Sequence, residues 1–176
     1  AVAAVASIGL GRPVKWIATR SEVFLTDHQA RDQRANASLA LDAQGRFLAL
    51  RVDSTANAGA YLVSTGGVQT FQYPHLTGSV YRIPAMALRV AAVLTNTTPV
   101  GVTRGPGFAE AINIIERLID AAARRCGWDR AALRRLNMVP SSAMPMVNAL
   151  GEQVDSGAFA ETLDLALAAA DIDGFD

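Results

Sequence analysis

Apolar residues recur at helical spacing between positions 108 and 126, and this pattern constrains the fold of the chain more than any other. On one side of the predicted helix, at steps of four and three, are Phe108, Ile112, Ile115, Ile119, Ala122 and Cys126. On the opposite side, at the same steps, are Glu110, Asn113, Arg117, Asp120 and Arg124. Such a stripe is typical of an amphipathic helix that packs one face against a core. We therefore expect Cys126 to be buried and Arg117, Asp120 and Arg124 to form a solvated face.

The first half of the chain alternates apolar and polar residues, which is typical of β-strands. Two extended runs meet at turn residues 42–45, so residues 34–61 predict a long antiparallel hairpin. Further strands are predicted at residues 14–20 and 87–94. Residues 62–78 have no convincing period and are predicted to form an irregular loop.

Helices are predicted at both ends of the chain. Residues 1–10 are rich in alanine and are followed by Gly11, a combination that indicates the last turns of a helix. Asp129 is placed to cap a helix over 130–136, and residues 159–170 predict a closing helix. The expected fold class is therefore α+β, with strands first and helices after, in a single segment.

The composition excludes several classes of function. Sixteen basic residues balance sixteen acidic ones, so the charge gives no reason to expect a nucleic acid or an anionic membrane as partner. The single cysteine, Cys126, excludes an intrachain disulfide and a cysteine-built zinc site, and it fits a reducing compartment. His28 and His75 have no third ligand at compatible spacing, so no metal site is predicted.

The two ends of the chain suggest a segment of a longer protein. The apolar run at residues 1–10 is too short to span a bilayer, and no basic segment precedes it as a signal peptide would require. There is no starting Met, and residues 171–176 follow a helix without a closing element. The alternative is a mature small protein with an unusual N-terminus. We expect a cytoplasmic location, with periplasmic export of the longer protein left open.

The most unusual stretch is residues 99–107, PVGVTRGPG, which lie between a predicted strand and the long helix. Its glycines permit unusual backbone conformations and let a ligand approach the main chain closely. The helix that follows begins with free N–H groups, and Arg104 adds a permanent charge with a fork of donors. These features favour an anion-binding loop, and a tight structural turn with a solvated Arg104 remains the alternative. The third glycine of a dinucleotide-binding fingerprint is missing, and no Lys-Ser or Lys-Thr pair completes a Walker loop.

Short motifs along the chain carry a family resemblance. In order, they are GRPVKW (11–16), NAGAY (57–61), YRIP (81–84), TNTTP (95–99), RGPG (104–107), IERLID (115–120) and LRRLN (133–137). The ordered series covers nearly the whole chain and resembles the molybdopterin-binding large subunits of the xanthine dehydrogenase and aldehyde oxidase family. The resemblance implies that residues 1–176 are an internal segment of the molybdopterin-binding domain.

The resemblance also implies an activity and a site. Such enzymes hydroxylate an electrophilic carbon of an aldehyde or heterocycle with oxygen from water, using molybdenum-molybdopterin, in bacterial members typically the cytosine dinucleotide form. Iron–sulfur clusters and usually FAD lie on partner subunits or domains. By the same resemblance, Arg104, Gly105 and Gly107 contact the cofactor, and Thr103, Pro106 and Phe108 shape the substrate pocket. The remainder of the large subunit and a small-molecule substrate are the other expected partners.

The sequence departs from the family in ways that limit these expectations. Thr103, Pro106 and Phe108 replace residues that the xanthine-oxidising and bacterial relatives often carry, which puts a flat purine substrate in doubt. The loop lacks the copper-binding cysteine of the carbon monoxide dehydrogenases. No residue matches the family's catalytic glutamate, so no catalytic residue is nominated and the isolated segment is expected to be inactive. Two alternatives stay open: a non-catalytic packing and subunit-interface segment, and an independent anion- or nucleotide-binding module.

Overall fold

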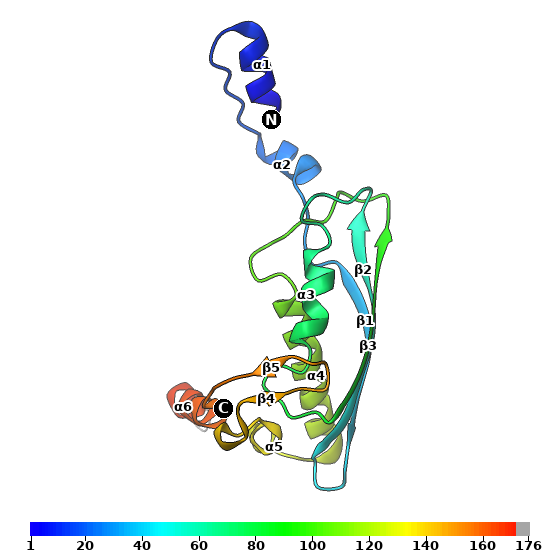
Figure 1. Ribbon diagram of the computed structural model, residues 1–176, viewed down its shortest axis with the longest axis vertical. Helices are drawn as coiled ribbons and strands as arrows, with labels where there is room; N and C mark the ends of the chain where they lie inside the picture. Colours follow the sequence, from blue (N-terminus) through cyan, green and yellow to red (C-terminus); the bar gives the residue numbers. More distant parts are fainter. Residues whose placement is uncertain (172–176) are drawn as a thin grey trace.

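The structure, a computed structural model, describes residues 1–171 (Figure 1). Its body is a three-stranded sheet in the order β1 (Gln33–Leu41), β2 (Phe47–Gly59) and β3 (Ala85–Leu94). Helices α3 (Val68–Leu76) and α4 (Phe108–Cys126) lie on one face of this sheet. The expected α+β class is therefore confirmed.

The predicted hairpin is present. Strands β1 and β2 pair antiparallel, from Gln33 opposite Ala56 to Leu41 opposite Phe47. In the turn, Oδ1 of Asp42 accepts hydrogen bonds from the amides of Gln44 (2.9 Å) and Arg46 (2.8 Å). A side chain that satisfies the amides of its own turn is the chemistry that the sequence predicted here.

Strand β3 lies on the other side of β2, and these two strands run parallel. Parallel neighbours need a crossover connection, and α3 lies in that connection. The prediction of an irregular loop over 62–78 was therefore wrong. Helix α3 contains Pro74 and buries only Gln69 and Tyr73, so its sequence shows almost no apolar period.

Helix α4 supplies the centre of the core. Its buried face consists of Ala111, Ile115, Ile119 and Ala123, each no more than 1% exposed. Cys126 is exposed and Phe108 is 48% exposed, so the predicted burial of Cys126 was wrong. These two lie at the ends of the helix, but Ile112, also on the predicted stripe, is 46% exposed within it. The buried face is the row at positions 111, 115, 119 and 123, so the predicted stripe was only partly right. Gly127, at φ 69°, ends the helix as predicted.

Helix α5 (Arg130–Asn137) is capped by Asp129, whose Oδ1 accepts from the Ala132 amide at 2.7 Å, as expected. Its last residue, Asn137, is 4% exposed and links the helix to the hairpin. The Asn137 side chain accepts from the Phe47 amide at 2.8 Å and donates to the Gly45 carbonyl at 2.9 Å. Beyond it lie η1 (Ser141–Ala143), the paired strands β4 (Met146–Val147) and β5 (Gln153–Val154), and the predicted helix α6 (Phe159–Ala170).

Residues 1–26 form an arm that projects from the body (Figure 1). The arm contains the predicted helix, α1 (Val2–Leu10), and a helix that was not predicted, α2 (Arg20–Thr26). Residues 14–19 have no regular secondary structure, so the strand predicted at 14–20 was wrong. Its β-branched and aromatic residues have no strand beside them in residues 1–171, and a strand forms only with a partner.

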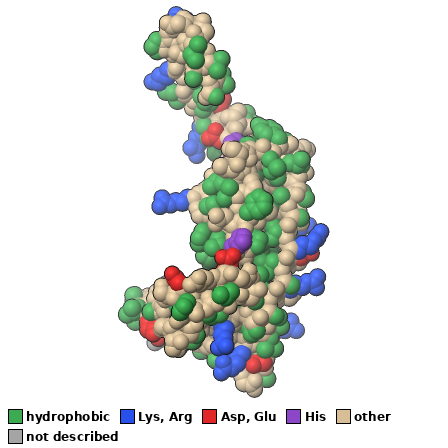
Figure 2. Space-filling model, viewed as in Figure 1, with side chains coloured by type: hydrophobic (Ala, Val, Ile, Leu, Met, Phe, Trp, Pro, Cys, Tyr) green, Lys and Arg blue, Asp and Glu red, His purple; other side chains and the backbone are tan. Residues whose placement is uncertain are grey.

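Large apolar side chains of the arm are exposed, and Figure 2 shows them distributed along it. They are Val2, Val5, Ile8, Leu10, Trp16, Ile17, Val23, Phe24 and Leu25. None of the helices in residues 1–171 has both the length and the apolar character needed to cross a membrane.

Candidate functional site

The predicted site residues lie together on one loop between β3 and α4. Gly105 and Gly107 have φ values of 71° and 81°, in the left-handed region that favours glycine. Gly107 is the N-cap of α4. A Cβ atom at Gly107 would lie 2.7 Å from the amide nitrogen of Tyr73, so this glycine lets the loop pack against α3.

Gly105 has a different environment. A Cβ atom built on Gly105 would meet no other atom within 4 Å. The side chains of Thr103 and Arg104 are exposed, Gly105 and Pro106 are half-buried, and Phe108 is about half exposed. The predicted cofactor-binding and substrate-pocket residues thus form one short segment, residues 103–108, which we call the Arg104 loop; its residues are exposed or half-buried except Gly107, which is buried.

The donors of the Arg104 loop fit an anionic group. Within residues 1–171, the amides of Arg104, Gly105 and Gly107 donate to no backbone carbonyl. The Arg104 guanidinium forms none of the ion pairs found in this part of the chain. Unpaired amides at a helix N-terminus, beside an arginine, are suited to phosphate or oxo groups. The loop therefore has the donor chemistry that a molybdopterin would need.

One residue that contacts the Arg104 loop was missed by the sequence analysis. Arg31 Nη2 donates to the Arg104 carbonyl at 2.5 Å, and Nη1 donates to the Gly105 carbonyl at 3.4 Å. Nη1 also lies 3.3 Å from Oε2 of Glu110, whose side chain is only 8% exposed. Arg31 lies 73 residues before Arg104 in a polar stretch with no periodic pattern, so no local signal in the sequence could have identified this contact.

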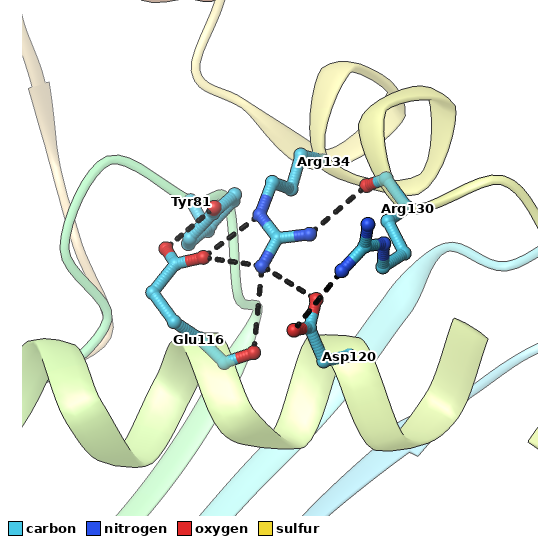
Figure 3. Close-up of polar contacts among 5 residues, drawn as sticks. All are labelled: Tyr81, Glu116, Asp120, Arg130 and Arg134. Atoms are coloured by element: carbon cyan, nitrogen blue, oxygen red, sulfur yellow. Dashed lines mark hydrogen bonds and ion pairs between the residues drawn. The ribbon is translucent and has the colours of Figure 1, made fainter. Parts of the chain in front are cut away.

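A second polar cluster lies about two turns further along α4 and holds α5 against it (Figure 3). Arg134 binds Glu116 at 2.7 Å and Asp120 at 2.9 Å, and Glu116 accepts from the Tyr81 hydroxyl at 2.7 Å. Asp120 was predicted to belong to a solvated helix face, and this was wrong because Arg134 and Arg130 reach it from α5.

The electrostatics of this cluster favour a structural role. Burial, followed by the hydrogen bond to Glu116, raises the pKa of Tyr81, so its hydroxyl remains a proton donor. Burial lowers the pKa of Arg134, but the hydrogen bonds to Asp120 and Glu116 outweigh burial and raise the pKa overall. Arg134 therefore keeps its charge and its ion pairs at all ordinary pH values. In residues 1–171, no three His, Cys, Asp or Glu side chains group closely enough to hold a metal ion.

Comparison with known proteins identifies the family. Residues 1–138 match the family model described as the molybdopterin cofactor-binding domain. The chain belongs to this family. It is 35% identical to the carbon monoxide dehydrogenase large chain of Hydrogenophaga pseudoflava over 96% of its length. It is 32% identical to the nicotine 6-hydroxylase large subunit of Paenarthrobacter nicotinovorans over 90% of its length.

Solved structures show the same domain architecture. Quinoline 2-oxidoreductase from Pseudomonas putida 86 matches 99% of the chain with 37% identity and a TM-score of 0.93. The chain spans about a fifth of the length of these relatives: 21% of the Hydrogenophaga protein and 22% of the quinoline enzyme chain. The resemblance of the sequence to the xanthine dehydrogenase and aldehyde oxidase large subunits is thereby confirmed.

Proposed function

We propose that this molybdopterin cofactor-binding domain forms one wall of the cofactor site in a molybdenum hydroxylase large subunit. The observation that carries the proposal is the Arg104 loop, where an exposed arginine that forms no ion pair in residues 1–171 belongs to the same short segment as the unpaired amides and the open Gly105. Arg104 and the amides of Gly105 and Gly107 would hold the pterin phosphates or the oxo groups. Gly107 would contribute its amide only, because its α-carbon is packed against α3.

The bound cofactor would supply the two-electron redox chemistry by which a carbon is hydroxylated with oxygen from water. The chain itself would bind and orient. Arg104 would neutralise anionic charge at every ordinary pH, since its guanidinium does not deprotonate in proteins. Thr103, Pro106 and Phe108 would border the substrate, with the ring of Phe108 offering an apolar surface that is 48% exposed in this chain.

The substrate would be an aldehyde or a heterocycle. The relatives named for nicotine and quinoline support this class. A carbon monoxide dehydrogenase is also similar, but the copper-binding cysteine implied for those enzymes is absent from residues 103–108. The cytosine dinucleotide form of the cofactor, iron–sulfur and FAD partners, and a cytoplasmic location belong to the same proposal. The single cysteine supports a reducing compartment.

The exposed arm supports a second, compatible role as a packing segment. Trp16, Ile17, Phe24 and Leu25 are each at least 66% exposed, and α1 exposes all its large apolar residues. An apolar surface of this extent marks an interaction site. Because the relatives are about five times longer than this chain, we infer that the arm packs against the remainder of the large subunit. Family membership argues against the independent nucleotide-binding module.

The test is Arg104→Ala in the enzyme that contains this chain, purified with its partner subunits. Loss of a charge-assisted contact to an anionic cofactor is expected to lower molybdenum per subunit by about tenfold or more. Molybdenum is measured by inductively coupled plasma mass spectrometry, with pterin quantified in parallel. Arg34→Ala is the matched control, because Arg34 is exposed on β1 and contributes to none of the ion pairs in residues 1–171. Full activity with normal molybdenum in Arg104→Ala would refute the proposal.

A further inference from the structure

We infer that Arg31 is a positioning residue for the Arg104 loop, holding its carbonyls inward so that the Gly105 amide remains available to an anionic ligand. The inference rests on the proposed function of that loop. Arg31 uses two nitrogen atoms at once, Nη2 on the Arg104 carbonyl and Nη1 on the Gly105 carbonyl. These are two consecutive carbonyls of the segment whose amides are proposed to face the cofactor.

The orientation of the loop follows from the planarity of the peptide unit. In a trans peptide, the C=O of one residue and the N–H of the next point in opposite directions. When Arg31 binds the Arg104 carbonyl, the Gly105 amide must therefore point away from Arg31. Gly105 is also the residue whose α-carbon faces open space. One side chain thus fixes the direction of the donor beside Arg104.

The charge of Arg31 is balanced at the same place. Its Nη1 lies 3.3 Å from Oε2 of Glu110, in the first turn of α4. Because Glu110 is 8% exposed on its side chain, this carboxylate needs a cation beside it. The pairing neutralises both groups. Arg104 is then the positive charge that the loop offers to a ligand, without a second cation competing for it.

The backbone around Arg31 is fixed on both sides. Arg31 has φ 66°, a conformation that non-glycine residues seldom adopt unless their surroundings impose it. The Gln29 amide donates to the Pro99 carbonyl at 3.1 Å, and the Gly101 amide donates to the Gln29 carbonyl at 2.8 Å. On the other side, Asp32 accepts from the Asn57 side chain at 2.8 Å. Arg31 therefore reaches the loop from a segment that is itself anchored to β2 and to the connection between β3 and α4.

The first measurement is amide hydrogen exchange on this chain, comparing Arg31→Ala, Arg31→Lys and the matched control Arg34→Ala. In Arg31→Ala we expect the Phe108 amide, which donates to the Gly105 carbonyl, to exchange about tenfold faster, because the loop loses two hydrogen bonds from a charged donor. Amides of β2 should exchange as in the unchanged chain. Arg31→Lys keeps the charge but loses the planar fork, so it should restore the loop only in part.

The second measurement is molybdenum per subunit in the full enzyme with its partner subunits, which reads cofactor retention and not turnover. Arg31→Ala should lower it at least about threefold, Arg31→Lys less, and Arg34→Ala not at all. The inference is overturned if Arg31→Ala retains normal molybdenum while Arg104→Ala loses it. It is equally overturned if β2 and the loop accelerate together, since that result means a general loss of stability. Normal molybdenum in Arg104→Ala refutes the proposed function itself, whatever Arg31→Ala does to exchange.

Discussion

Gly105 and Gly107 share a motif and a left-handed backbone, yet the structure predicts different consequences when each is replaced by alanine. Alanine at Gly105 would place its Cβ in open space, whereas alanine at Gly107 would place it 2.7 Å from the Tyr73 amide nitrogen and 2.9 Å from Gln72 Cβ. The two variants therefore form a matched pair. Each carries a backbone penalty for alanine at positive φ, and only Gly107→Ala adds a steric one.

The expected losses of stability follow from the backbone penalty and the steric penalty. An alanine held at positive φ costs about 1–2 kcal/mol, offset by about 0.4–1 kcal/mol because alanine is less flexible than glycine in the unfolded chain. Gly105→Ala should therefore lower the free energy of unfolding by about 1 kcal/mol. In Gly107→Ala the added methyl group meets a backbone atom of α3, which cannot rotate away, and overpacking adds about 1–3 kcal/mol. We expect a total of about 2–4 kcal/mol.

The assay is urea unfolding of this chain, monitored by far-ultraviolet circular dichroism. Each variant is measured at several protein concentrations. The slope against urea should be unchanged, so that the midpoint reports stability. Losses that agree within about 0.5 kcal/mol between the two variants would refute the steric argument, since that is the size of an ordinary surface substitution. A larger loss in Gly105→Ala would refute the description of Gly105 as open.

Two further predictions concern parts of the fold outside the Arg104 loop. Asn137→Ala should destabilise the chain by about 2–3 kcal/mol in the same urea assay, because it leaves the buried Phe47 amide without its acceptor. The control is Asn36→Ala, at an exposed position of β1. Equal losses of stability in the two variants would contradict the prediction. The hydrogen bonds from the Thr19 backbone and then its side chain lower the pKa of Glu22. The capping contribution to α2 is therefore present above the pKa of an unfolded glutamate and is lost as the pH falls through the lower folded value. A nuclear magnetic resonance titration of Glu22 should show this, and Thr19→Ala should move the pKa back upward; an unmoved pKa would exclude the side-chain bond.

The elements that were predicted correctly are those with local signals. The hairpin has Asp42 in its turn, Gly127 follows the last residue of α4, and Asp129 caps α5; each signal acts within about four residues. Local hydrogen bonds of this kind do not depend on the rest of the fold. The sequence could therefore place these elements before anything was known of their packing.

The elements that were missed depend on distant partners. The parallel pairing of β2 with β3 requires α3, whose helical nature is hidden by its weak apolar period and by Pro74. Residues 14–20 have strand composition but no neighbouring strand in residues 1–171. Cys126 lies on the apolar stripe of α4 but at its end, beyond the packed turns. In each case the composition suggested a structure whose formation depends on whether another element packs beside it.

The same distinction between local signals and distant contacts applies to the single residues of the candidate site. Arg104, Gly105 and Gly107 were selected together because glycines beside an arginine favour a close approach of a ligand. That reason suits Gly105, whose α-carbon is open, but Gly107 is accounted for by its contact with α3. The residue that fixes the loop, Arg31, has no motif at all and acts across 73 positions of sequence. A motif can thus nominate a loop, but which of its residues face a ligand is decided by the segments packed behind it. For this loop those segments are α3 and the anchored stretch around Arg31.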